Sequence, residues 1–252
     1  MTRPRLLIAL ALLFGLVLTA CGQVPPSTRA PAGSTTSGQS APASPASPAA
    51  SASSSPSVSG SAGAGGCAYT PAGTPAKPVD PPPVTGVATS GTVKYVLKMT
   101  NGDVTLTLDR SKAPCTVNSF TSLADQGFFD KTTCHRLSDS GIFILQCGDP
   151  TGTGNSGPGY QFANETTGRE TYTSGVVAMA NAGPGTNGSQ FFLVWEDSTA
   201  LDANPDYTIF ATMDKASRDI VAGMAAEGQN GANPDGTGKP NNPSEIISAK
   251  KG

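Results

Sequence analysis

The sequence predicts an all-β fold, a closed antiparallel barrel capped by two helices, for its C-terminal 162 residues. Three observations favour it: a β-hairpin signal at the start of this region, several short apolar stretches separated by loops rich in Gly, Asn and Pro, and two segments with helical periodicity. Closure is expected because it removes the exposed edges of an open sheet. Residues 91–252 hold nearly all of the large apolar side chains, enough for one core.

The elements of this domain follow in order along the chain. Residues 93–109 (VKYVLKMTNGDVTLTLD) alternate apolar and polar side chains on both sides of Asn101-Gly102, which predicts a hairpin. A helix is predicted to begin near Pro114 and end near Gly127, and a second one over 217–228. Short strands are expected near 132–137, 142–147, 175–180, 189–195, 207–213 and 244–250.

Residues 1–20 are predicted to be a lipoprotein signal peptide. Two arginines precede an apolar run that is too short to span a bilayer as a mature helix, and the run closes with LTAC at Cys21. This pattern resembles bacterial lipoproteins, in which the cysteine becomes the N-terminus and carries acyl chains such as palmitate. We therefore expect lipidation of Cys21, which would place the protein on the extracytoplasmic face of the cell membrane.

Residues 21–90 are rich in Ala, Ser, Pro and Gly and are predicted to form a disordered tether. From Cys21 to Gly66 such a chain would reach roughly 40 Å. Near its end, Cys67 and Tyr69 could pin the segment to the domain surface. Loss of the two signal-peptide arginines changes the formal charge from -2 to -4, and no basic patch is present, so we expect no nucleic-acid partner.

The stretch CHRLSDSGIFILQCGDP, residues 134–150, contains the only histidine of the chain. A zinc site would need paired cysteine spacings that are missing, so no metal is expected. Cysteines of exported proteins more often form disulfides. Four cysteines allow three pairings, which stay open; our hypothesis joins Cys134 to Cys147 across a hairpin near Ser140-Gly141, and Cys67 to Cys115.

Two other chemical interpretations are disfavoured. GTGNSG, residues 152–157, matches a dinucleotide-binding fingerprint, but Pro158 and the residues after it do not open a helix, so a loop is expected. Nucleophilic catalysis would require His135 to activate a serine or cysteine. Neighbouring strand residues point to opposite faces, so if Arg136 faces a site, His135 faces the core.

Three longer segments resemble the successive signatures of cyclophilin-type peptidyl-prolyl isomerases: CHRLSDSGIFILQCGDPTGTG, GVVAMANAGPGTNGSQFFLVW and LDANPDYTIFATM. The resemblance covers essentially all of 91–252 and is strongest to exported actinobacterial members. It implies an eight-stranded closed barrel with two helical caps, a substrate groove on the outside face, no cofactor, and isomerisation of X-Pro bonds during the folding of exported proteins.

The resemblance also implies site residues. The catalytic group would be Arg136, Phe143 and Gln146. The substrate-binding group would be Ile144, Ala180, Asn181, Ala182, Gln190, Phe192, Leu201 and Tyr207. In two places the chain departs from the family. Ala200 stands where many members have a tryptophan, so weak cyclosporin binding is expected, and the turn LSDSGIF is about two residues longer than in the shortest members.

These residue types suit the reaction. Amide resonance opposes rotation about an X-Pro bond with a barrier of roughly 18 to 20 kcal/mol, and a fixed guanidinium beside an apolar pocket can stabilise the twisted amide. A rate near ~10³ s⁻¹ would require lowering that barrier by about 6 to 7 kcal/mol. We expect a monomer that binds proline-containing polypeptides. A non-catalytic proline-segment binder or holdase and, more remotely, a structural lipoprotein are the alternatives.

Overall fold

The computed structural model describes residues 66–252. The predicted signal peptide, the predicted lipidation of Cys21 and the predicted tether as far as residue 65 lie outside the described residues. Among residues 66–252, no helix is long and apolar enough to cross a membrane.

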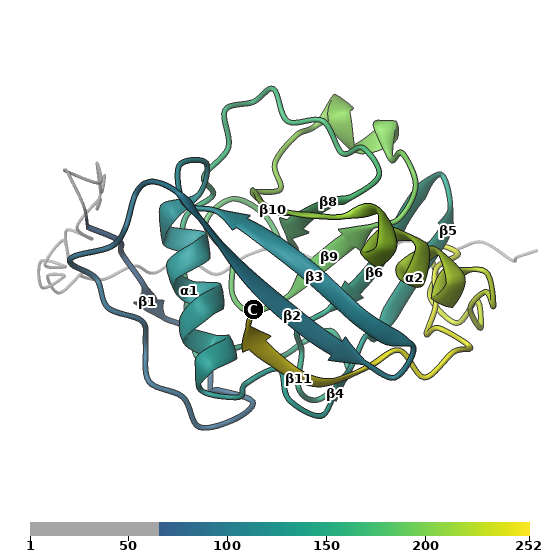
Figure 1. Cartoon of the computed structure of the whole chain (residues 1–252), viewed down its shortest axis with the longest axis horizontal. Coiled ribbons are helices and arrows are strands. Elements are labelled where there is room, and N and C mark those ends of the chain that lie inside the picture. The colour runs from purple at the N-terminus through teal and green to yellow at the C-terminus, as the bar shows by residue number, and fades with distance from the viewer. Residues whose placement is uncertain (1–65) are drawn as a thin grey trace, which may run out of the picture. The chain divides into compact units, whose positions relative to one another are not determined.

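Nine antiparallel strands form the main sheet, in the order β4-β11-β2-β3-β10-β8-β9-β6-β5 (Figure 1). Their bounds are β2 Thr92–Met99, β3 Gly102–Asp109, β4 Thr132–Thr133, β5 Arg136–Ser140, β6 Ile142–Cys147, β8 Val176–Met179, β9 Phe191–Val194, β10 Ile209–Met213 and β11 Glu245–Lys251. The predicted hairpin around Asn101-Gly102 is confirmed, since β2 and β3 pair from Thr92↔Asp109 to Met99↔Gly102. The strand expected near 132–137 is divided into β4 and β5, the strand expected over 142–147 is β6 with the same ends, and the remaining expected strands are present with slightly different ends.

The expected closed eight-stranded barrel is not what the hydrogen-bonded ladder shows. The ladder has nine strands, and its end strands β4 and β5 do not pair with each other within the described chain. They are consecutive in sequence, separated by Cys134 and His135 alone. Cys134 N–H donates to the Ser244 carbonyl on one side, and His135 N–H donates to the Gln146 carbonyl on the other. The chain itself therefore crosses between the two ends of a curled, open sheet.

Three short elements were not predicted. β1 (Thr70–Pro71) and β7 (Tyr160–Gln161) form a separate two-stranded sheet, and the 3-10 helix η1 covers Thr199–Ala203. Elements of two residues or one turn carry too few side chains to produce a periodic pattern.

Two α-helices pack on the sheet, α1 (Pro114–Asp125) near β11 and β3, and α2 (Lys215–Ala225) on β3 (Figure 1). Pro114 occupies the first turn of α1, as its sequence position predicts. Asp214 caps α2 by accepting a hydrogen bond from the Ser217 N–H at 2.8 Å. Both predicted helices are confirmed, and α2 begins two residues earlier than expected because this cap precedes its apolar stripe.

Alternation along the strands separates two apolar clusters. Leu145, Phe191 and Leu193 belong to the large interior core, which is closed by α1 and α2. Their neighbours on the opposite face, including Ile144 and Phe192, form a second, smaller cluster. The sheet thus carries an apolar surface on its outer side as well as its inner one.

Residues 67–90 were assigned to the tether, but the structure places them against the domain. Cys67 is joined to Cys115 of α1, and the Tyr69 hydroxyl donates to the Cys115 carbonyl at 2.7 Å. Lys77 Nζ donates to the Phe128 carbonyl at 3.0 Å. A disulfide and long-range hydrogen bonds fix this Pro-rich segment, and composition does not reveal such partners. The folded part therefore includes Cys67 and does not begin at residue 91.

Both disulfides of the favoured pairing are present. Cys134 and Cys147 lie on either side of the predicted hairpin, with Cα atoms 4.0 Å apart. Cys67 and Cys115 have Cα atoms 5.5 Å apart. The first bridge ties the residue two positions before Arg136 to the end of β6.

Candidate functional site

A small cavity of about 130 Å³ opens over the outer cluster, and we call it the outer groove. Its lining residues are Arg136, Ile142, Ile144, Gln146, Ala180, Asn181, Phe192, Leu201 and Tyr207. The floor comes from β6 and β9, whose outward side chains are brought together by the pairing Ile144↔Val194 and Gln146↔Phe192. The structure therefore gathers eight of the predicted site residues in one place.

Arg136 stands at the edge of the groove, at the start of β5. It pairs directly with Gln146 of β6, and Arg136 Nη1 donates to Gln146 Oε1 at 3.2 Å. The side chain of Arg136 is 26% exposed, so the guanidinium is held by the protein while part of it faces solvent. A fixed cation beside an apolar pocket is the arrangement predicted for this site.

A chain of amide hydrogen bonds continues from Arg136 along the rim. Gln146 Nε2 donates to Gln190 Oε1 at 2.9 Å. Gln190 Nε2 in turn donates to the carbonyls of Gly154 and Ser156 at 2.9 and 3.0 Å. Gln190 lines the adjoining cavity and not the outer groove itself. The GTGNSG segment thus serves as a loop that anchors this chain, which agrees with its assignment as a loop.

Phe143 is one of the predicted site residues that do not line the outer groove. It is absent from the groove lining, and its ring packs edge-on against Trp195 with centroids 5.1 Å apart. Ile142 lines the groove instead. The reason is strand alternation: counting back from Gln146, residues 144 and 142 share its face, whereas 143 points away. The same count in the sequence would have found Ile142.

The segment after β8 borders the groove and two neighbouring cavities. Asn181 lines all three cavities, whereas Ala182 lines only the two neighbours. The Asn181 side chain is occupied, with Nδ2 donating to the Asp206 carbonyl at 3.1 Å and Oδ1 accepting from the Gly183 N–H at 3.1 Å. Among the hydrogen bonds of residues 66–252, none uses the Asn181 backbone. That backbone can therefore bind an extended peptide.

Tyr207 also lines the groove, and its backbone is held by the side chain of Tyr172. Phe192 packs edge-on against Tyr207 with ring centroids 5.4 Å apart. The Tyr172 hydroxyl donates to the Tyr207 carbonyl at 2.9 Å and accepts from the Tyr207 N–H at 3.0 Å. Burial raises the pKa of Tyr172 to about 12, so its hydroxyl remains a donor at neutral pH. Sequence reasoning missed Tyr172, because its contact with Tyr207 joins distant loops.

Ala200 lines a second cavity of about 380 Å³ that adjoins the groove through Leu201 and Tyr207. An alanine fills little of this space. The position is exposed and lies on η1, so a larger side chain there would meet solvent and the cavity wall.

His135 faces away from the groove, as strand alternation predicts. Both ring nitrogens are buried without a hydrogen-bond partner. Burial lowers the pKa of His135, while the nearby Asp149 carboxylate opposes this effect. The imidazole is therefore neutral at pH 7, and it is not among the residues that line the outer groove.

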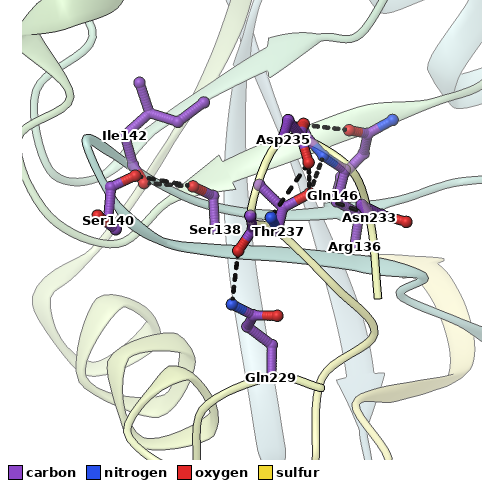
Figure 2. Close-up of polar contacts among 10 residues, drawn as sticks. Arg136, Ser138, Ser140, Ile142, Gln146, Gln229, Asn233, Asp235 and Thr237 are labelled. Atoms are coloured by element: carbon purple, nitrogen blue, oxygen red, sulfur yellow. Dashed lines mark hydrogen bonds and ion pairs between the residues drawn. The ribbon is translucent and has the colours of Figure 1, made fainter. Parts of the chain in front are cut away.

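Two further residues contact Arg136 from a loop that the sequence analysis did not connect with the site. Arg136 Nε donates to Thr237 Oγ1 at 2.9 Å, and Arg136 Nη2 forms an ion pair with Asp235 Oδ2 at 2.9 Å (Figure 2). About 100 residues separate these partners in sequence. No local pattern could signal such a contact.

Within residues 66–252, no group of three or more His, Cys, Asp or Glu side chains could hold a metal ion. The groove instead combines one guanidinium, two amide side chains, free backbone groups and an apolar floor. Such a site can bind a peptide and stabilise charge on it, and it offers no activated nucleophile.

Comparison with known proteins adds a family match. The model of the family described as "Cyclophilin type peptidyl-prolyl cis-trans isomerase/CLD" matches residues 94–251. A "Probable peptidyl-prolyl cis-trans isomerase B" of Mycobacterium leprae is 44% identical over 185 residues, which are 66% of this chain and 62% of that protein. The protein of the same name from Mycobacterium tuberculosis is 45% identical over 186 residues, 65% of this chain and 59% of that one. The chain thus spans about three fifths of the length of these relatives.

Solved structures agree. A Cryptosporidium parvum cyclophilin-type peptidyl-prolyl cis-trans isomerase superposes with a TM-score of 0.57 at 27% identity, covering 64% of this chain and 98% of that one. A second structure of that protein, determined in the presence of the dipeptide Ala-Pro, gives a TM-score of 0.56 at 27% identity and covers 63% and 98% of the two chains.

Proposed function

The chain belongs to the cyclophilin-type peptidyl-prolyl cis-trans isomerase family, and we propose that it accelerates cis-trans rotation about X-Pro bonds. The observation that carries this proposal is the position of Arg136, held by β5–β6 pairing beside an apolar groove of about 130 Å³. A pocket of this size suits one small ring, and a partly exposed guanidinium at its edge can reach the adjoining amide.

The mechanism follows from the chemistry of the amide. During rotation the C–N bond loses its double-bond character and the proline nitrogen regains its lone pair. N–H donors of Arg136 can hydrogen-bond to the proline carbonyl and towards that nitrogen, which stabilises the twisted form more than either planar isomer. The donors are fixed before the substrate binds, so little reorganisation accompanies the reaction. No proton is removed and no bond is broken, and no cofactor takes part.

The remaining groove residues would bind and orient the peptide. Phe192, Leu201 and Ile144 would provide the apolar floor for the proline ring, together with Ile142. The backbone of Asn181 would pair with the peptide preceding the proline, supported by Ala180 and Ala182. Gln146 and Gln190 would hold Arg136 and the rim, and Tyr207 would close the far end.

We further propose that the protein is a monomeric lipoprotein attached through Cys21 to the extracytoplasmic face of the membrane, acting on exported proteins. Two disulfides support an oxidising compartment. The low-complexity residues from Cys21 to Gly66 would serve as the tether. Globomycin-sensitive processing and radiolabelled palmitate incorporation, lost in Cys21→Ala, would test this attachment.

The test of activity is exchange NMR of an Ala-Pro peptide with the purified protein and with Arg136→Ala at equal folded concentration. Fast cis-trans exchange is expected with the wild type, reduced by about 100-fold in the variant. Binding of the peptide without faster exchange in either protein would contradict the proposal, and would instead support a proline-segment binder or holdase. Absence of any binding would support a structural role.

A further inference from the structure

The segment between α2 and β11 forms a loop that folds back on the outer edge of β5. Leu137 and Gly238 exchange backbone hydrogen bonds, and Gln229 and Pro240 form a bridge at the base of the loop. Gln229 Nε2 also donates to Asp139 Oδ1 of β5 at 3.2 Å. We call residues 229–240 the clamp loop.

A side chain at Gly238 would disturb the packing within the clamp loop. A Cβ atom there would collide with the side-chain oxygens of Gln229 and Asn230. Thr237, next to it, is 6% exposed, whereas residues 231–236 are exposed, so the loop is packed where it reaches β5. The position of the clamp loop beside Arg136 is therefore set by its backbone pairing with Leu137, the next residue of β5.

Within the clamp loop, Asp235 and Thr237 form one hydrogen-bonded unit. Thr237 donates to Asp235 Oδ1 twice, from its hydroxyl at 2.7 Å and from its N–H at 3.1 Å. The other carboxylate oxygen, Oδ2, remains for Arg136 Nη2 at 2.9 Å. Asn233 Nδ2 donates to Thr237 Oγ1 at 3.0 Å. Figure 2 shows Asp235, Thr237 and Gln146 gathered around Arg136.

Arg136 thus has three of its five N–H donors committed to protein acceptors, one each on Asp235, Thr237 and Gln146. The acceptors come from two elements, the clamp loop and β6, which hold the planar group from different sides. Hydrogen bonds from Thr237 and then from Arg136 lower the pKa of Asp235 to about 2, so its carboxylate stays charged well below neutral pH. A guanidinium held at three positions keeps two donors in fixed directions.

We propose that Asp235, together with Thr237, is a positioning residue for isomerisation, which fixes the Arg136 guanidinium so that its two remaining donors meet the twisted amide. The inference rests on the proposed function, because it names what orients the arginine of that site. It also assigns a role in the reaction to the clamp loop, far from β5 and β6 in sequence.

The two acceptors make different contributions. Asp235 supplies charge as well as orientation, and a charge-assisted hydrogen bond is stronger than a neutral one. Asn at this position loses the charge and keeps one acceptor oxygen in place of two, so it can accept from Arg136 or from Thr237 but not from both. Comparing Asp235→Ala with Asp235→Asn therefore measures how much of the effect a single neutral acceptor restores.

The experiment measures exchange NMR of an Ala-Pro peptide and the Arg136 Nε–Hε resonance in the full chain, for wild type, Asp235→Ala, Asp235→Asn and Thr237→Val. The resonance is assigned by its absence in Arg136→Lys. Asp139→Asn is the matched control, because it removes an equal charge that also contacts the clamp loop but does not touch Arg136.

For Asp235→Ala we expect kcat to fall about tenfold with little change in KM, since a charged hydrogen bond of the transition-state donor is lost. We also expect its Nε–Hε signal to exchange faster with water than in the wild type. Asp235→Asn should recover part of both properties. The control should retain wild-type kcat and the wild-type signal.

Equal loss of activity in Asp235→Ala and Asp139→Asn would overturn the inference, as would an unchanged Nε–Hε signal in both Asp235→Ala and Thr237→Val. If the wild type does not accelerate exchange at all, the proposed function fails. The resonance still reports in that case whether Asp235 and Thr237 hold Arg136, so the two failures are distinguishable.

Discussion

Arg136 and Gln146 face each other across β5 and β6, with Arg136 Nη1 donating to Gln146 Oε1 at 3.2 Å. Gln146 also donates a hydrogen bond to Gln190, so the Gln146 amide connects the Arg136 guanidinium with the rim of the groove. Because Gln146 both accepts from and donates to site residues, its replacement affects more than one contact.

Replacing Gln146 with Leu should lower kcat/KM for an Ala-Pro peptide by about tenfold, because a hydrogen bond to a charged donor is removed. Gln190→Leu removes the link to Gln146 and the hydrogen bonds to the Gly154 and Ser156 carbonyls, but it leaves Arg136 paired with Gln146, so its loss should be smaller. Exchange NMR at matched folded concentration compares the two. A larger loss in Gln190→Leu would show that the rim, and not the arginine contact, limits activity.

Tyr172→Phe should remove the two hydrogen bonds that hold the backbone of the groove residue Tyr207. The change leaves the backbone N–H and carbonyl of Tyr207 without their partner, at a cost of about 1 to 3 kcal/mol in the free energy of unfolding. Peptide KM should rise, because Tyr207 is no longer held. Urea unfolding and peptide titration measure the two effects.

Tyr69→Phe is the control for that variant. Its hydroxyl bonds to the Cys115 carbonyl, away from the groove, so a loss of stability without a change in KM is expected. If both variants raised KM equally, a general loosening of the domain would explain the result.

The free energy of unfolding should fall as pH falls from about 7 towards 5.5, with His135 responsible. Burial holds the folded-state pKa of His135 below its ordinary value of 6.5, so the unfolded chain binds the proton more readily. The stabilisation is complete above the unfolded pKa and is lost as the pH falls below it.

His135 is the sole histidine of the chain, so His135→Asn should flatten this part of the profile. Carboxylates titrate mainly at lower pH. A wild-type slope that persists unchanged in the variant, measured by urea unfolding at several pH values, would assign the effect to another group.

Removing the Cys67–Cys115 disulfide with a double alanine variant should lower stability and leave turnover intact. The two cysteines are 48 residues apart in sequence. For a loop of that length the chain-entropy model gives a stabilisation of about 4 kcal/mol as an upper value. Thermal unfolding and exchange NMR measure the two properties. A comparable loss of activity would mean that the segment from Cys67 to Pro83 also shapes the groove.

Cyclosporin should bind the wild type weakly, with a Kd above about 1 μM, because Ala200 leaves the neighbouring cavity of about 380 Å³ unfilled. Ala200→Trp supplies a large apolar surface and an N–H donor, and should tighten binding by at least about tenfold. Isothermal titration of both proteins decides the matter. Submicromolar binding of cyclosporin by the wild type would contradict the prediction that Ala200 weakens this binding.

Much of the fold was accessible from local patterns. The alternation on both sides of Asn101-Gly102 predicted the β2–β3 hairpin, and Pro114 with Gly127 predicted the bounds of α1, because turn and helix-end preferences act over a few residues. The cysteine hypothesis also succeeded, since Cys134 and Cys147 lie at opposite ends of one predicted hairpin. The groove residues Ile144 and Gln146 of β6 were predicted from the family resemblance, as was Phe143, which does not line the outer groove.

The sequence by itself therefore determined the family signatures, the main elements and most of the groove residues, all of which depend on neighbouring positions in the chain. Only the tertiary structure decided that the end strands β4 and β5 do not pair, that Cys67 belongs to the folded part, and that Asp235 and Thr237 hold Arg136. Those contacts join residues tens to a hundred positions apart, and the free energy that forms them comes from packing and hydrogen bonding in the assembled domain, which no local preference records.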